Sequence, residues 1–346
     1  MSSTARGSFV GVDGGGTHTV ALVGSSTGEI LGRGVAGPSN PQAVGFEAAV
    51  EQIEAAIRAA LVGPHPQPLS ISTEMERGDG TPRSAPLSIS DEGSPLRRGS
   101  GVRQITLGIA GCGRPSDRQR LAAMLSERLG LAPAAVRVVT DVALLLPAAN
   151  LESGIALVAG TGSSAFGVSP TGRTANAGGW GYLLGDDGSA FEVGRHALRA
   201  ILRADDGLGP PTQLTAAVKQ ALGVSQPRDL IRVVYQSPSP RTTIAELAPL
   251  VVSVARDGDG IARQIVARAG EILGQLACAV ARRLALGSDA TVIGTGGLFQ
   301  AGDLVVAPLR RSLDRVGLDD FRLLDAEPAI GALRLATGEV RLESNG

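Results

Sequence analysis

The residues best suited to phosphate chemistry in this chain are glycines grouped in turns beside an aspartate or a hydroxyl. Asp13 is followed directly by Gly14, Gly15 and Gly16, and then by Thr17. Because consecutive glycines remove every Cβ from a turn, its backbone N–H groups can approach a phosphate closely. The Asp13 carboxylate could hold Mg²⁺, and the Thr17 hydroxyl could donate to the phosphate. An ordinary tight turn needs only two glycines, so we favour phosphate binding here.

A second turn of this kind contains Gly160, Thr161, Gly162 and Ser163. Together with the residues that follow, it matches the G-x-G-x-x-A pattern of dinucleotide-binding loops, but that pattern requires a helix to begin there. Residues 166–170 read Phe-Gly-Val-Ser-Pro, which cannot begin a helix. We therefore interpret this turn as a second phosphate-binding turn.

A third glycine turn, with Gly294, Gly296 and Gly297, follows a short apolar run. Bare backbone at this turn could admit an adenine ring. An ordinary strand-to-helix turn explains the same residues equally well, so both interpretations stay open.

Two further aspartates are candidates for chemistry because of their positions. Asp141 ends an apolar run that we expect to be a buried strand, and such a carboxylate opens towards the crevice where α/β sheets bind ligands. It could accept the proton of an attacking hydroxyl, or it could simply cap the next helix. Trp180 lies among glycines, as is typical of a sugar-facing loop. Downstream of it, Asp187 or Ser189 could cap a helix, so Asp186 is the better binding candidate.

Composition excludes several classes of protein. The chain has 346 residues with a net charge of −1, so we expect neither nucleic acid nor a membrane surface as a partner. Lys219 does not follow a glycine loop, which excludes a Walker A site. No leader segment or apolar run of membrane-spanning length is visible, and two cysteines indicate a reducing compartment. We expect a cytoplasmic protein.

Apolar periodicity predicts an α/β architecture in which the second half repeats the first. Strands are expected at 8–13, 17–23, 29–35, 104–110 and 136–139, and then at 155–159, 165–169, 291–293 and 322–324, with helices at 46–61, 116–129 and 304–313. Residues 64–101 are rich in Pro, Ser and Gly, and we expect a disordered insertion there, or less favourably a lid. The expected lobes are 1–148 with a returning C-terminal helix in 326–346, and 149–325.

These motifs together resemble the N-acetylglucosamine kinases and the wider BadF/BadG/BcrA/BcrD ATPase family. The most specific part of the resemblance is Gly178-Gly179-Trp180-Gly181 followed by Gly185-Asp186-Asp187-Gly188-Ser189. The resemblance implies a duplicated ribonuclease-H-like fold, as in actin and hexokinase, with two lobes and a central cleft. It also implies a homodimer.

The resemblance further implies roles for individual residues. Asp141 would be the base for the sugar 6-hydroxyl as that hydroxyl attacks ATP, and the three glycine turns would hold the phosphates and the adenosine. The sugar would be lined by Asn40, Thr161, Gly179, Trp180, Asp186 and Ala190.

The expected function is therefore ATP-dependent phosphorylation of an amino sugar, first of all N-acetylglucosamine, although glucosamine and N-acetylmuramic acid stay open. One alternative is an ATPase activator of a 2-hydroxyacyl-CoA dehydratase, which needs cysteine thiolates to hold an iron–sulfur cluster. For that role Cys278 is expected in the core and Cys112 is expected to be more exposed. The other alternative is a non-catalytic sugar sensor with the same fold.

Overall fold

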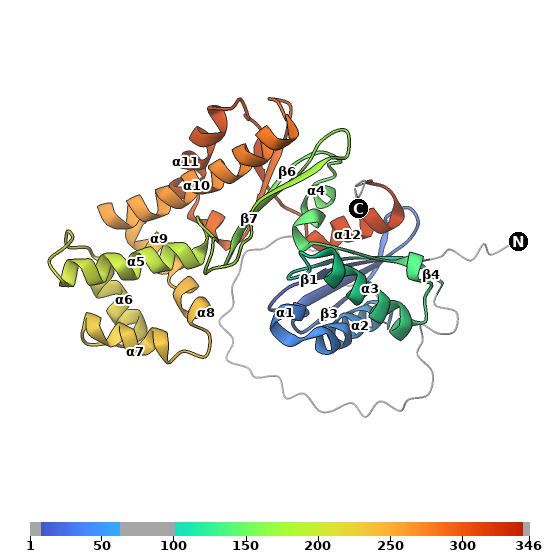
Figure 1. The fold of residues 1–346 in the computed structure, drawn as a ribbon, viewed down its shortest axis with the longest axis horizontal. Helices are drawn as coiled ribbons and strands as arrows, with labels where there is room; N and C mark the ends of the chain where they lie inside the picture. Colours follow the sequence, from blue (N-terminus) through green and yellow to red (C-terminus); the bar gives the residue numbers. More distant parts are fainter. Residues whose placement is uncertain (1–7, 63–100, 342–346) are drawn as a thin grey trace, which may run out of the picture. The chain divides into compact units, whose positions relative to one another are not determined.

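The structure, a computed structural model, describes residues 8–62 and 101–341, and these form two compact units. Unit 1 contains the chain up to Asp141 together with Pro328–Glu339, and unit 2 contains Val142–Glu327 together with the residues from Val340 onwards (Figure 1). All but the last residue of the segment 64–101, where we expect an insertion, lies outside the described residues. The units are described separately below.

The sheet of unit 1 is built from an antiparallel meander extended by two parallel strands. Its order is β3-β2-β1-β4-β5, with β4 parallel to β1 and β5 parallel to β4. This arrangement confirms the predicted meander. The strands are β1 (Ser8–Gly14), β2 (Thr19–Gly24), β3 (Ile30–Ala36), β4 (Val102–Ile109) and β5 (Val136–Val139).

Helices cover both faces of this sheet. Apolar side chains of α2 (Phe46–Val62) and α3 (Pro115–Leu129) form one buried cluster with β1, β4 and β5, and α12 (Pro328–Thr337) packs on β1, β2 and β4. A Cβ at Gly11 would overlap the backbone of Leu333, so glycine lets α12 lie directly against β1. The short elements of this unit are α1 (Pro41–Val44) and η1 (Pro133–Ala135).

Unit 2 repeats the same sheet. Its order is β10-β9-β6-β7-β8, again with three antiparallel strands followed by two parallel ones. The duplicated ribonuclease-H-like fold predicted from the sequence is therefore confirmed. The strands are β6 (Gly154–Ala159), β7 (Ser163–Val168), β8 (Thr174–Gly178), β9 (Val292–Thr295) and β10 (Phe321–Leu323).

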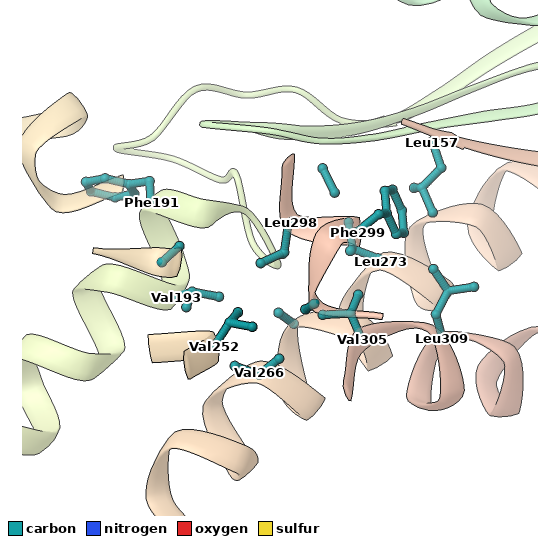
Figure 2. Close-up of a cluster of buried hydrophobic side chains, with 14 of the residues drawn as sticks. Leu157, Phe191, Val193, Val252, Val266, Leu273, Leu298, Phe299, Val305 and Leu309 are labelled. Carbon is teal, nitrogen blue, oxygen red and sulfur yellow. The ribbon is translucent and has the colours of Figure 1, made fainter. Parts of the chain in front are cut away.

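Between its third and fourth strands, unit 2 carries more helices than the described residues of unit 1 show between theirs. The long helix α10 packs against α11 and the sheet, and Figure 2 shows Leu273 of α10 close to Leu157, Phe299 and Leu309 in this core. The helices are η2 (Asp141–Leu144, which begins in unit 1), α4 (Leu145–Ala148), α5 (Ala190–Asp205), α6 (Leu214–Leu222), η3 (Pro227–Asp229), α7 (Leu230–Tyr235), α8 (Pro240–Ala245), α9 (Ala248–Arg256), α10 (Gly260–Leu284), η4 (Gly297–Ala301) and α11 (Asp303–Asp314).

Most predicted element boundaries differ from the structure by one or two residues, and two of these differences have a clear local reason. The strand expected from residue 17 begins at Thr19, because the Gly15 N–H donates to the His18 carbonyl at 3.0 Å and closes the turn later. The helix expected over 116–129 begins one residue earlier, at Pro115, because proline suits the first helical position. Across the described ranges we find no helix long and apolar enough to cross a bilayer.

Candidate active site

The first glycine turn joins β1 to β2 and is held by backbone hydrogen bonds on both sides. The Ala110 N–H donates to the Gly14 carbonyl at 2.8 Å, and the Ser39 N–H donates to the Gly15 carbonyl at 3.0 Å. A Cβ at Gly14 would overlap Ser39, so this glycine serves the packing of the turn. Gly16 is exposed and has no atom within 4 Å of the position that a Cβ would take, so it can accept a ligand against bare backbone. Gly14 and Gly15 are therefore fixed by packing and hydrogen bonds, whereas Gly16 leaves open space beside the backbone.

Asn40 lies next to this turn and caps α1. Its side-chain Oδ1 accepts from the backbone N–H of Gln42 at 3.0 Å, and the side-chain amide of Gln42 donates to the Gly111 carbonyl at 2.8 Å. Gly111 has a φ of +81°, and a Cβ there would overlap the Asn40 side chain. Asn40 is thus fixed beside the carboxyl end of β4.

Asp141 follows β5, at the same edge of the sheet, and begins the 3-10 helix η2. Its side chain is half-buried. Burial raises the pKa of the neighbouring Cys112 thiol to about 11, and the Asp117 and Asp141 carboxylates act in the same direction against Arg118. Asp141 therefore lies within electrostatic range of Cys112. The structure leaves both interpretations of Asp141, base and helix cap, in place.

The exposure predicted for Cys112 is wrong. Its side chain is fully buried in the apolar cluster of unit 1, and Cys278 is buried in unit 2 as expected. The flanking glycines suggested an open loop. Gly111 instead has a left-handed backbone that turns the chain so that Cys112 packs inwards.

The second glycine turn joins β6 to β7 and is tied to the start of α5. The Gly160 N–H donates to the Gly162 carbonyl at 3.0 Å, and the Ala190 N–H donates to the Gly160 carbonyl at 2.9 Å. Thr161 is exposed at the tip of the turn, and the Cβ position of Gly160 has nothing within 4 Å. The Ser163 hydroxyl donates to the Asp187 carbonyl at 2.7 Å, so its hydrogen is used inside the protein.

Asp186 is a buried carboxylate that connects this turn to α8. Its side chain is 4% exposed, its Oδ1 accepts from the Ser163 N–H at 3.3 Å, and its Oδ2 accepts from the Arg241 guanidinium at 3.0 Å. Ser189 caps α5 by accepting from the Glu192 N–H at 3.2 Å. Ser189 is therefore the capping residue of α5, and the binding role of Asp186 stays a prediction.

Arg241, the ion-pair partner of Asp186, was not predicted from the sequence. It lies 55 residues beyond Asp186 on a separate helix, and no local motif marks it. Its guanidinium lies 5.6 Å above the Tyr182 ring, and its Nε is buried with no hydrogen-bond partner in the described structure. A Cβ at Gly162 would come within 2.9 Å of Arg241 Nη2. A cation thus lies directly beside the second glycine turn.

The loop between β8 and α5 carries Trp180 on its surface. The Gly179 N–H donates to the Ser163 carbonyl at 3.0 Å, which ties this loop to the second turn. Trp180 is 74% exposed, and the neighbouring Leu183 and Leu184 are also exposed. Five of the proposed sugar-binding residues therefore gather in unit 2, namely Thr161, Gly179, Trp180, Asp186 and Ala190, while Asn40 shares unit 1 with Asp141.

The third glycine turn follows β9, next to the second turn. Gly296 has a φ of +116°, and a Cβ there would overlap the Ala159 carbonyl. A Cβ at Gly294 would come within 2.8 Å of the Phe321 ring, so both glycines serve the fold. Gly297 alone among the three has nothing within 4 Å of its Cβ position.

Each glycine turn, taken within its own unit, offers a place where a phosphate group could bind. The turns leave open space beside the bare backbone of Gly16, Gly160 and Gly297. In the part of the chain that the structure describes, no three acidic, histidine or cysteine side chains gather to hold a metal by themselves. Mg²⁺ bound to phosphates needs only one or two carboxylates, and the half-buried Asp13 at the end of β1 could supply one.

Comparison with known proteins assigns the family. The sequence model of the BadF/BadG/BcrA/BcrD ATPase family matches residues 10–336. The chain belongs to this family. A relative from Dictyostelium discoideum, named N-acetyl-D-glucosamine kinase, is 28% identical over 336 residues, which are 95% of this chain and 97% of the relative.

One further relative and one solved structure that resemble this chain also carry the name of an N-acetylglucosamine kinase. A relative from Clostridium acetobutylicum, named N-acetylmuramic acid/N-acetylglucosamine kinase, is 32% identical over 195 residues, which are 56% of this chain and 63% of the relative. A crystal structure from Chromobacterium violaceum, provisionally assigned as an N-acetylglucosamine kinase, is 27% identical with a TM-score of 0.68, and the match covers 96% of this chain and 99% of that one.

Proposed function

We propose that this family member is an ATP-dependent kinase that phosphorylates the 6-hydroxyl of an amino sugar, N-acetylglucosamine first of all. The observation that carries the proposal is the match to the Dictyostelium N-acetyl-D-glucosamine kinase along 95% of this chain. The open glycine turns and the half-buried Asp141 supply the chemistry that such an enzyme needs.

In the proposed reaction Asp141 accepts the proton of the sugar 6-hydroxyl. The hydroxyl oxygen forms a bond to the γ-phosphorus of ATP, the bond from that phosphorus to the β–γ bridging oxygen breaks, and ADP leaves. A positioned base of this kind contributes about 10²–10⁴-fold to the rate. Asn40 and Asp186 would orient the sugar, because both side chains are already fixed by hydrogen bonds.

Charge stabilisation would come chiefly from the backbone. The N–H groups of the first two glycine turns that are not used inside the turns would stabilise developing charge at little cost in reorganisation, because hydrogen bonds already hold both turns in shape. Mg²⁺ at Asp13 would supply further positive charge to the phosphates. Phosphoryl transfer depends mostly on such positioning and electrostatics, so a site without a lysine suffices.

The test is ATP turnover with a sugar panel of N-acetylglucosamine, glucosamine, N-acetylmuramic acid and glucose. We expect turnover with N-acetylglucosamine and formation of its 6-phosphate. Turnover with none of the panel by a folded protein would refute the proposed substrate class. Sugar binding without turnover would instead support the sensor function.

The activator function is disfavoured by the cysteines. Cys112 and Cys278 are the two cysteines of the sequence, and both side chains are buried in separate units. A cluster shared between subunits needs thiolates at a surface. Absorbance of the purified protein between about 350 and 450 nm, where iron–sulfur clusters absorb, would contradict this conclusion.

We also infer a cytoplasmic homodimer. Two unpaired, buried thiols fit a reducing compartment, where ATP is supplied. Sedimentation equilibrium of the full chain tests the oligomeric state, and a monomer at all protein concentrations would contradict the inference.

A further inference from the structure

A pocket of about 460 Å³ lies in unit 2, between α5, α10 and the chain at Gly209 and Pro210. One face of each helix lines it, since the lining residues of each helix are spaced three, four and seven residues apart. The side chains that carry the argument are His196, Arg199 and Arg203 from α5 and Gln264 and Arg268 from α10. The two helices pack against each other (Figure 1).

The charge of this pocket is strongly positive. Its lining contains three arginines and a histidine but no acidic residue. Arg199 has no hydrogen-bond or ion-pair partner among residues 8–62 and 101–341. Within the described part of the chain, Arg203 donates to the Leu208 carbonyl at 2.8 Å, and Arg268 pairs with the exposed Glu271 at 3.0 Å. Most guanidinium N–H groups around the pocket are therefore available to a ligand.

Apart from Glu271, which pairs with Arg268, the acidic side chains at the N-terminal ends of these two helices are engaged by other groups. Glu192 is held by Arg195 and His196, with the His196 nitrogen 2.7 Å away. Asp259 caps α10 and accepts from the Ala262 N–H at 2.8 Å, besides donors near Thr212. The first two turns of α10 line the pocket, where a helix dipole also favours an anion.

We propose that this pocket binds a small phosphorylated ligand that carries at least two negative charges. The planar guanidinium fork matches phosphate oxygens in pairs, and three arginines around one space suit more than one charge. The volume lies within the range of small-molecule sites, and Ile261 and Ile265 offer an apolar wall to a carbon skeleton.

The proposed pocket is separate from the candidate active site. Asp186 and the Ser189 cap precede α5, whereas the pocket begins at its second turn, at His196. No proposed role for sugar or ATP involves the arginines of the pocket. The proposal therefore does not depend on the kinase function.

The test is calorimetric titration of the full chain with inorganic pyrophosphate, in the presence of saturating N-acetylglucosamine and a non-hydrolysable ATP analogue. The test variant is Arg199→Ala/Arg268→Ala, since neither side chain anchors the backbone. The control is Arg228→Ala/Arg232→Ala, which removes the same charge from exposed positions of unit 2 outside the pocket. Arg199→Lys/Arg268→Lys keeps the charge and guards against a folding defect.

We expect the alanine pair in the pocket to weaken pyrophosphate binding about tenfold or more, the control to change it by less than about threefold, and the lysine pair to fall between them. Binding that is unchanged in the alanine pair, equal losses in both alanine pairs, or no binding up to about 10 mM would each overturn the proposal. Titration with N-acetylglucosamine 6-phosphate shows whether the ligand is the product of the proposed reaction or another phosphorylated compound. Because the readout is binding, failure of the kinase assay would leave this result interpretable.

Discussion

The Asp186–Arg241 ion pair gives a sharp stability prediction. Arg241→Ala would leave a carboxylate that is 4% exposed, with the Ser163 N–H as its remaining donor among the described residues. Breaking a fully buried pair from one side costs about 3–5 kcal/mol, whereas an exposed pair contributes about 0–1 kcal/mol. The Arg241 side chain is 40% exposed, so we expect a loss of about 1–3 kcal/mol in the free energy of unfolding.

A double-mutant cycle isolates the electrostatic part of this loss. In the Asp186→Asn background, Arg241→Ala should cost less than about 1 kcal/mol, because a neutral amide needs no counter-charge. The matched control is Arg268→Ala, which breaks an exposed pair with Glu271 and should cost less than about 1 kcal/mol.

Urea unfolding followed by far-UV circular dichroism measures these free energies, and Trp180 fluorescence reports on unit 2 because Trp180 is the single tryptophan. Equal costs of Arg241→Ala in both backgrounds would refute the argument. They would show that the guanidinium stabilises the loop by packing on Tyr182 and not by neutralising a buried charge.

Three further predictions concern catalysis, backbone and pH. Asp141→Asn should lower kcat by about 10²–10⁴-fold and leave the Kd of N-acetylglucosamine nearly unchanged, and unchanged turnover would remove Asp141 from the mechanism. Gly296→Ala should lower the melting temperature, because its Cβ would overlap the Ala159 carbonyl. Gly297→Ala should leave the melting temperature of the unmodified protein unchanged and raise the KM for ATP. Equal melting temperatures of the two variants would contradict this prediction. Burial alone would raise the pKa of Glu192, but hydrogen bonds from its histidine and arginine partners outweigh it and lower the pKa to about 2. The ionised Glu192 should therefore stabilise the protein above its ordinary pKa of 4.5, and this contribution should be lost as the pH falls towards 2. The difference in the free energy of unfolding between the unmodified protein and Glu192→Gln should shrink between pH 5 and pH 2. A difference that stays constant over this range would argue against the lowered pKa.

The order of the elements could be predicted from the sequence because buried strands and glycine turns leave strong local signals. The run from Phe9 to Val12 has no polar side chain and is followed by Asp13 and three glycines, and β1 ends at the first of these glycines. The repeat in unit 2 follows from the same pattern at Gly160. Exact ends were less predictable, because hydrogen bonds such as that between Gly15 and His18 depend on the folded turn.

The candidate site was predictable only where its residues are close in sequence. The stretch from Gly178 to Ser189 already contains Trp180, Asp186 and the cap of α5. Arg241 could not be found in this way, because its position beside Gly162 arises from the packing of α8 on α5. Cys112 was misjudged because flanking glycines suggested exposure, whereas tertiary packing buries its side chain.

The burial of both cysteines has a practical consequence for measuring the separation of the two units. A thiol that is withdrawn from solvent and has a raised pKa reacts slowly with maleimides, because the thiolate is the reactive form. A cysteine introduced at an exposed position of either unit would therefore be labelled selectively without removing the native ones. One dye on each unit would then report their separation by energy transfer as substrates are added.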